Sequence, residues 1–358
     1  MMNLVSNRLP YQEVQSMRIT VQPTKVIRTQ KRVQLWLLIL LTLFAYSPTS
    51  FAINLNPTSV KRIAEAYGFV YGQEYTLLRI AKEFPELTVS LELARAQFDS
   101  TFPDIKTKLE TQLKEAMGEK LFQKLATNLR TKLREILGRQ QITSDIAANF
   151  LERVKARSKG GIESPVLEYL LAVTYTANPV GEFADGFRQR YQTDGTGKSQ
   201  GIKINLQLPK SWAGKDGERP HIVQEWASEN GTGLEMIILD IRDGPGYNLT
   251  KKVMEEFVRS GEVKGAAPDG STYVASENFS LENQTGYWLQ YAMASERAGT
   301  KMYVDALMYQ FFFRGKAIAI TCQAAGPENE KSKVNEAFKR IRPLCQQVLN
   351  SVVLPQAY

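Results

Sequence analysis

Residues 301–313 read Lys-Met-Tyr-Val-Asp-Ala-Leu-Met-Tyr-Gln-Phe-Phe-Phe, which has the composition of a buried β-strand. Successive side chains of a strand point to opposite faces, and here both alternating sets are apolar. Such a strand needs packing layers above and below its sheet. We expect the C-terminal helix to form one layer, and either a helix at about 248–260 or part of the N-terminal helical region to form the other. The two sets are Tyr303, Leu307, Tyr309 and Phe311, and Met302, Val304, Met308 and Phe312.

Alternating apolar segments around this run predict the rest of the sheet. Asn230-Gly-Thr-Gly233 lies between two of these segments and is a strong hairpin signal. A C-terminal helix is expected at about 329–352, with a kink at Pro343. The other strands are expected at about 202–208, 222–228, 234–241, 272–281, 286–296 and 317–324.

The segment before the sheet follows a helical pattern. Apolar residues recur there at helical spacing, and proline and glycine mark the ends of the periodic runs. Gly118 is expected to split the third helix into two antiparallel pieces, and Gly68 and Gly72 allow another helix to approach closely. Helices are predicted at about 58–84, 88–101, 104–138, 144–158 and 165–175.

The predicted fold class is α+β, with an N-terminal helical bundle followed by a mostly antiparallel sheet sandwiched by helices. We predict a helical domain over 53–192, a linker or long turn over 193–200, and an α/β sandwich domain over 201–358. The linker is rich in Gly, Ser and Thr. It resembles the end of a phosphate-binding loop but has Gln192 where that pattern requires glycine, so no nucleotide site is predicted.

The first 52 residues have the order of an export signal. Arg28, Lys31 and Arg32 precede an apolar run at 33–46, which is followed by Pro48 and a small-x-small end at Ala52. The run is shorter than the ~20 residues of a spanning helix. We predict a cleaved signal peptide and export, most simply to the bacterial periplasm. The alternatives are secretion from the cell or an uncleaved anchor, and the true start could be Met1, Met2 or Met17.

Charge gives no indication of a nucleic-acid partner. The first 52 residues hold six of the 45 Lys and Arg and one of the 37 Asp and Glu. The net charge of the remainder is therefore near +3 rather than +8. A nucleic-acid site would require a clustered basic face, which is not evident, so none is predicted.

Cys322 and Cys345 are the two cysteines of the chain. Cys322 shares a strand face with Ile318 and Ile320, and Cys345 lies on an apolar helical stripe. Both sulfurs should therefore point from faces that pack together, and in an oxidising compartment they are expected to form a disulfide. Two buried free thiols are the alternative.

The region 106–139 is the most basic element after the signal. Its candidate membrane-contact face consists of Lys106, Lys114, Lys124, Arg130 and Arg134. A basic amphipathic helix can lie on an anionic membrane surface. The competing interpretation is a solvated face whose other side packs in a bundle, which the interspersed glutamates favour.

The sequence predicts no catalytic, cofactor-binding or metal site. His221 is the only histidine, and it accompanies neither a Cys/His cluster nor a nucleophile motif. A carboxylate-dependent hydrolase remains an alternative, because two acidic residues need only spatial proximity. The candidates lie on one predicted hairpin and are Glu225, Glu235, Asp240 and Asp243.

Leu208-Pro-Lys-Ser-Trp212 and Ser351-Val-Val-Leu354, with the strand and helix order between them, resemble the PsbP-type and DcrB-type exported α/β/α sandwich. The resemblance covers about 201–354, and 58–176 has no counterpart in it. It implies an α/β/α fold and a non-enzymatic, exported binding or assembly role. No functional residue carries over.

We therefore expect a non-catalytic envelope protein with an accessory or assembly role. Its partner is an unidentified protein or small ligand, and the candidate contact surface is aromatic: Trp226, Trp288 and Tyr309. The alternatives are the peripheral membrane-surface protein and the hydrolase described above.

Overall fold

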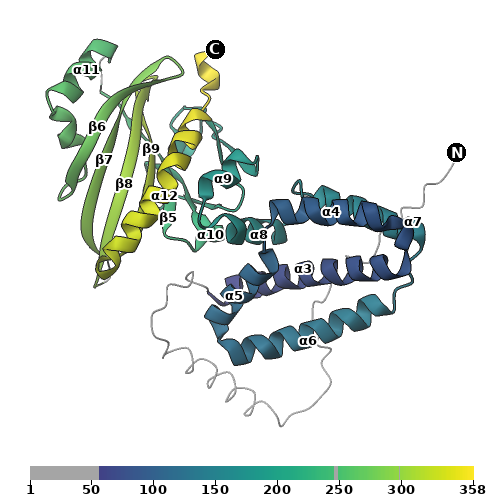
Figure 1. The fold of residues 1–358 in the computed structure, drawn as a ribbon. Coiled ribbons are helices and arrows are strands. Elements are labelled where there is room, and N and C mark those ends of the chain that lie inside the picture. The colour runs from purple at the N-terminus through teal and green to yellow at the C-terminus, as the bar shows by residue number, and fades with distance from the viewer. Residues whose placement is uncertain (1–55, 246–248, 298) are drawn as a thin grey trace, which may run out of the picture. The chain divides into compact units, whose positions relative to one another are not determined.

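The computed structural model describes residues 56–245, 249–297 and 299–358 (Figure 1). The predicted signal peptide lies outside these residues. The fold is α+β, as predicted: helices occupy the first part of the described chain, and a mostly antiparallel sheet with helices follows. One hydrophobic core belongs to the helical region, and a large and a small core lie on the two sides of the sheet.

The helical region contains the helices that the sequence predicts. Asn56 caps the first one, because its Oδ1 accepts a hydrogen bond from the Ser59 amide at 2.9 Å. The helices are α3 (Pro57–Glu83), α4 (Thr88–Thr101), α5 (Ile105–Met117), α6 (Glu119–Gly138), α7 (Ser144–Arg157) and α8 (Val166–Tyr175).

Gly118 separates α5 from α6, as predicted, and its φ of 81° is a conformation that other residues rarely adopt. Contacts with α3 give the helix directions. Lys106 reaches Glu74 while Glu110 reaches Tyr67, so α5 is antiparallel to α3. The chain then reverses, and α6 runs parallel to α3. At Gly68 an added Cβ would lie 3.3 Å from Leu129, so the glycine lets α6 approach closely, as its spacing predicted.

The main sheet has seven strands in the order β3-β4-β5-β9-β8-β7-β6, and every neighbouring pair is antiparallel. β9 therefore lies in the centre although it is the last strand in the chain. The strands are β3 (Ala213–Asp216), β4 (Ile222–Ala227), β5 (Glu235–Asp243), β6 (Thr272–Leu281), β7 (Gln284–Arg297), β8 (Thr300–Phe313) and β9 (Lys316–Pro327).

Helices lie on both faces of this sheet, as the composition of 301–313 predicts. α12 (Lys331–Asn350) packs on β9, β8 and β5, and α11 (Lys251–Arg259) packs on β6 and β7. The second layer is thus the short helix and not the N-terminal bundle. On β8, Leu307 and Phe311 belong to the large core under α12, whereas Met308 and Phe312 pack against the small core on the opposite side.

Residues 193–200 connect β1 (Arg188–Gln192) to β2 (Asn205–Pro209), and these two strands pair with each other in a small separate sheet. The segment is thus the connection between paired strands. Before β1, the short helix α9 (Pro179–Ala184) contributes Phe183 to the large core of the sandwich. We therefore propose that a division into two domains would fall between α8 and α9, earlier than 193–200.

Glu182 on α9 is a buried carboxyl group with 1% exposure. Its two oxygens accept hydrogen bonds from the Ser211 amide at 2.7 Å and the Ser211 hydroxyl at 2.6 Å. Burial raises the pKa of Glu182 from 4.5 to about 7, even though the bonds from Ser211 oppose the shift. Folding thus favours the protonated form, and ionisation costs stability.

We expect the Glu182 contribution to stability to be lost as the pH rises from about 4.5 to about 7. Glu182→Gln retains an acceptor for Ser211 but does not ionise, so its free energy of unfolding should fall less than that of the wild type between pH 5 and pH 7.5. Urea unfolding at the two pH values measures this difference. Glu86→Gln, at an exposed position, is the control. Equal pH dependence in all three proteins would contradict the assignment.

Candidate functional site

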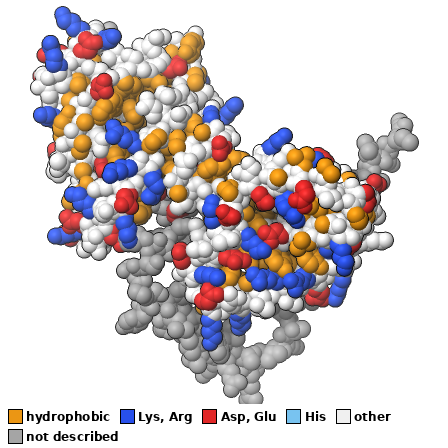
Figure 2. Space-filling model, in the orientation of Figure 1, with side chains coloured by type: hydrophobic (Ala, Val, Ile, Leu, Met, Phe, Trp, Pro, Cys, Tyr) orange, Lys and Arg blue, Asp and Glu red, His pale blue; other side chains and the backbone are white. Residues whose placement is uncertain are grey.

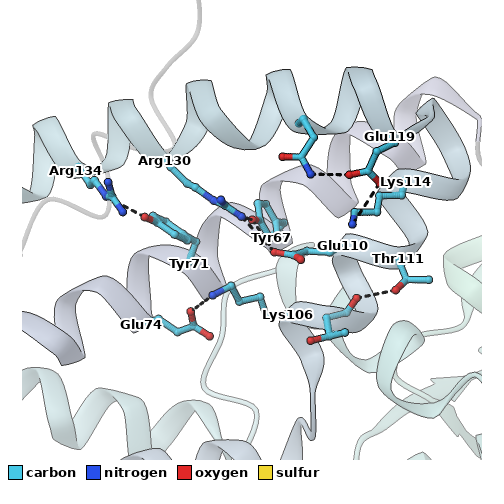
Figure 3. A network of polar contacts seen from close by, with 12 residues as sticks. Tyr67, Tyr71, Glu74, Lys106, Glu110, Thr111, Lys114, Glu119, Arg130 and Arg134 are labelled. Carbon is cyan, nitrogen blue, oxygen red and sulfur yellow. Dashed lines mark hydrogen bonds and ion pairs between the residues drawn. The ribbon is translucent and has the colours of Figure 1, made fainter.

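Four of the five predicted membrane-contact residues form polar contacts between α3, α5 and α6 (Figure 3). Arg130 Nη2 donates to the Tyr67 hydroxyl at 2.9 Å, and this hydroxyl donates to Glu110 Oε1 at 2.9 Å. Arg134 Nε donates to the Tyr71 hydroxyl at 3.1 Å. Tyr67 is fully buried, and its burial raises the pKa of the phenol. Two of the five predicted cations therefore connect α6 to α3.

The other three candidates differ in their surroundings. Lys106 forms an ion pair with Glu74, and Lys114 forms one with Glu119 at 3.3 Å. Lys124 is exposed, and no partner is recorded for it within the described chain. Four of the five cations thus have partners on neighbouring helices. Among the described helices, none combines the length and hydropathy that a bilayer span needs. Membrane contact through this face stays a prediction.

A matched pair of variants tests whether these contacts hold the bundle together. Arg130→Met removes the donor to Tyr67 but keeps a long aliphatic side chain, and we expect it to lower the free energy of unfolding by about 1 kcal/mol. Lys124→Met on the same helix should change it by less than about 0.5 kcal/mol. Chemical denaturation measures both. Equal effects would show that the Arg130 contacts add no stability.

The predicted aromatic contact surface is largely wrong. Trp226 has 2% exposure and Tyr309 has 6%, and both belong to the large core under α12. Their alternation along β4 and β8 points them toward that helix, where they cannot meet a partner. Trp288 differs from them, because it is only partly buried beside the same core.

The alternative hydrolase site cannot be built from Glu235 together with Asp240. Glu235 and Asp240 are five positions apart on β5 and therefore lie on opposite faces of the sheet. Glu235 Oε1 lies 3.0 Å from Arg340 Nη2 on α12, while Asp240 pairs with Arg242 on the other face. The two remaining candidates also have cationic partners: Glu225 pairs with Lys215, and Asp243 pairs with Lys316. The geometry does not support a hydrolase using Asp240 and Glu235.

The predicted disulfide is present. Cys322 on β9 and Cys345 on α12 are bonded, with their Cα atoms 6.0 Å apart, and neither residue is exposed. The bond joins the central strand to the helix that covers it.

A groove lies on the face of the sheet opposite α12. Its volume is about 990 Å³, near the upper end of the range for small-molecule sites. α11 and the following segment form one wall, and the floor consists of side chains from β5, β9 and β8. α12 covers one face of β5, β9 and β8. On the other face, the helix α11 packs over β6 and β7 and leaves these three strands open.

Strand register determines the shape of the floor. One row across the sheet consists of four residues on β5, β9, β8 and β7, each directly opposite the next. They are Asp240, Ala319, Gln310 and Tyr287. The neighbouring row places Thr321 between longer side chains from β5 and β8. Because β9 contributes small side chains at the centre of the sheet, the floor is lowest along this strand.

Three of the five carboxylates that line the groove, Asp240, Asp243 and Glu256, form ion pairs, whereas Glu262 and Asp269 have none among the described residues. Asp240 has 7% exposure and accepts two hydrogen bonds from Arg242, at 2.8 Å to Nε and 2.9 Å to Nη2. His221 Nε2 lies 3.5 Å from Asp240 Oδ2 and is buried without a hydrogen bond. Of the carboxylates lining the wall and rim, Glu256 pairs with Arg259.

Neutral hydrogen-bonding groups remain available on the floor and on the adjacent strand β7. Within the described chain no side-chain hydrogen bond is recorded for Gln310, Thr321, Tyr287 or Tyr291. Burial raises the pKa of Tyr287 to about 12, so its hydroxyl keeps its proton at neutral pH. Burial also raises the pKa of Tyr291, although the charge of Arg242 opposes this shift. The groove thus offers hydroxyl and amide groups beside apolar side chains.

The sequence analysis did not predict this groove. A signal existed in β9, where small or polar residues at 317, 319, 321 and 323 alternate with the apolar residues at 318, 320, 322 and 324. That alternation indicates a strand with one open face. It does not show which strands flank it, and the flanking side chains determine whether an open face becomes a groove.

Comparisons with known proteins give a weak likeness over part of the chain. No protein-family model matches it, and no curated protein matches it. The chain does resemble solved structures, and three of them illustrate the likeness. Cyanobacterial PsbP from Synechocystis is 18% identical, with a TM-score of 0.29, and the match covers 47% of this chain and 92% of that one. The Ran-binding protein Mog1p from Saccharomyces cerevisiae is 8% identical, with a TM-score of 0.31, covering 47% and 95%.

The third is LpqN from Mycobacterium tuberculosis, described as involved in cell envelope biogenesis. It is 13% identical, with a TM-score of 0.29, covering 49% of this chain and 96% of that one. The chain thus has a weak resemblance to PsbP-type and Mog1-type folds, of which the sequence suggested the PsbP type for the sandwich. At these scores the likeness says nothing about activity or partners.

Proposed function

We propose that this protein is a non-catalytic binding protein whose ligand occupies the groove between α11 and the open face of the sheet. The supporting observation is the set of hydroxyl and amide groups lining the groove that have no hydrogen-bond partner among the described residues. Small-molecule sites commonly combine a mainly apolar lining with a few such groups. Because Asp240 is paired with Arg242, we expect the ligand to carry hydrogen-bonding groups and little net charge.

The arrangement around His221 favours binding over acid–base catalysis. General base catalysis on a nucleophile needs the base within hydrogen-bond reach of that nucleophile. Within the described chain, no hydrogen bond joins His221 to a hydroxyl, and its nearest recorded charged group is Asp240, which already binds Arg242. Among the described residues His221 thus has no hydroxyl nucleophile to activate, which favours a binding role for the groove.

We further propose that the protein acts in the bacterial envelope. The buried Cys322–Cys345 bond supports this, because disulfides persist in oxidising compartments. The export signal at 1–52 is the sequence-based reason for the same proposal. A mature chain that begins at Ile53 in an envelope fraction would agree with it, and an uncleaved chain in the cytoplasm would contradict it.

Native mass spectrometry of the protein purified from its own cells tests the groove. Ala319→Trp places an indole on the floor, and Ala294→Trp, at an exposed position on β7 outside the groove, is the matched control. We expect a ligand mass on the wild type and on Ala294→Trp but not on Ala319→Trp. Gln310→Leu removes one polar contact at similar volume and should reduce the occupied fraction. The same ligand mass on all variants, or none on any of them, would contradict the proposal.

A further inference from the structure

The strand β6 forms one edge of the seven-stranded sheet and pairs only with β7. Within the described chain, no backbone hydrogen bond joins residues 272–281 to any other element. Alternate amide and carbonyl groups along its outer side therefore have no hydrogen-bond partner among residues 56–245, 249–297 and 299–358. Such a row of groups is a template for one more strand.

The two edges of the sheet differ in how they are protected. The opposite edge, β3, has only four residues and ends with Lys215 and Asp216. β6 has ten residues, contains no proline, lysine or arginine, and carries a single charged side chain, Glu277. A bulge lies between Tyr273 and Ala275, and regular pairing with β7 continues from there to Leu281. Proteins usually block long edges with short strands, prolines or cations, and β6 has none of these.

Apolar side chains lie beside this edge on the α12 side of the sheet. Phe279 packs edge-on against Tyr309, with ring centroids 5.6 Å apart, and its ring also covers Gly286 on β7. Phe279, Leu281 and Trp288 are only partly buried next to the large core. Figure 2 shows hydrophobic side chains reaching the surface over this part of the sheet, where α12 does not cover it.

We propose that β6 is the docking site for an extended segment of a partner protein, which pairs with it as an additional strand. Its alternate side chains would be apolar, over Phe279 and Leu281, with a lysine or arginine facing Glu277. Glu277 is exposed, and no partner for it is recorded among the described residues. A second copy of the chain could pair with the same edge, but β6 contains no cation to face Glu277.

Synthetic peptides can test this interface on the full chain. The probe Val-Thr-Val-Thr-Lys-Thr-Val-Thr-Val has valines and one lysine on the same side, and a second peptide has glutamate instead of lysine. A third has proline at its central position and at the next residue, so it lacks an amide donor to β6 whichever of its edges faces the sheet. We expect the lysine peptide to bind and to slow hydrogen exchange at alternate amides of β6, and the proline peptide not to bind.

Charge reversal makes the test specific. Glu277→Lys should weaken binding of the lysine peptide by about tenfold and strengthen binding of the glutamate peptide by a similar factor, because opposite charges across strands attract and like charges repel. Glu328→Lys, at an exposed position in the turn before α12, is the matched control and should change neither affinity. Ala319→Trp should bind the peptides like the wild type, since this interface does not depend on the groove.

Three results would overturn the proposal. One is absence of binding by the lysine peptide. Another is binding that Glu277→Lys leaves unchanged. The third is concentration-dependent protection of β6 in the protein alone, together with a doubled mass in solution, which would identify the occupant as a second copy.

Discussion

Replacing Phe311 by alanine is expected to lower the free energy of unfolding by about 3–5 kcal/mol, the range seen for buried phenylalanines. Phe311 is fully buried in the large core beneath α12. Removal of its side chain leaves a cavity between the sheet and α12. The disulfide between β9 and α12 limits how far this helix can move to fill the cavity.

The adjacent residue provides the control. Phe312 lies on the opposite face, lines the groove and is only partly buried. Phe312→Ala should therefore cost about 1 kcal/mol. Urea unfolding followed by circular dichroism measures both variants. If the two cost the same, or Phe312→Ala costs more, the assignment of the two faces of β8 would be wrong.

Removal of the disulfide has the second-largest expected effect. Cys322 and Cys345 are 23 positions apart, and the chain-entropy model assigns a loop of that size roughly 3 kcal/mol of stabilisation. The double variant Cys322→Ala/Cys345→Ala should lose about this amount, because the unfolded chain regains the freedom that the bond removes. The sheet pairing itself should remain, since β9 keeps both neighbours.

Reducing the disulfide of the wild type separates the stability lost with the bond from the stability lost because alanine is smaller than cysteine. Wild-type protein unfolded with a reducing agent present should approach the stability of the double variant, and the double variant should not respond to the reductant. An unchanged unfolding midpoint for the reduced wild type would argue against a stabilising bond. Mass spectrometry before and after alkylation confirms the oxidation state in each sample.

Much of the fold could be predicted because its elements carry strong periodic patterns. β8 has apolar residues on both faces, and this correctly predicted a sheet with packing layers on both sides. β1, β3 and α9 were missed. β1 reads Arg-Gln-Arg-Tyr-Gln, with one apolar residue, while β3 has four residues and α9 has six. Segments this short or this polar have no periodic signal, and their pairing is determined by the rest of the fold.

The candidate sites could be predicted much less well. Trp226 and Tyr309 were predicted to contact a partner because they are aromatic. The alternation of side chains along a strand does not show which of its faces is covered by a helix, and both residues are buried in the core. The basic residues of 106–139 were interpreted as a candidate membrane-contact face. Arg130 and Arg134, however, donate hydrogen bonds to tyrosines on α3 that are more than fifty positions earlier in the chain. Contacts over such distances in sequence depend on helix direction, which local patterns do not specify.

The central position of β9 has a consequence for the order in which the chain can fold during synthesis. β5 and β8 both pair with β9, which is made after either of them. Until β9 and α12 have left the ribosome, the sandwich consists of two incomplete half-sheets with bare inner edges, while the helices α3 to α8 are already complete. Nascent chains in this state expose strand edges and apolar surface, which is the condition that chaperones recognise. A nascent chain halted before residue 316 should therefore depend on a chaperone to remain in solution, whereas the released chain of 358 residues should not.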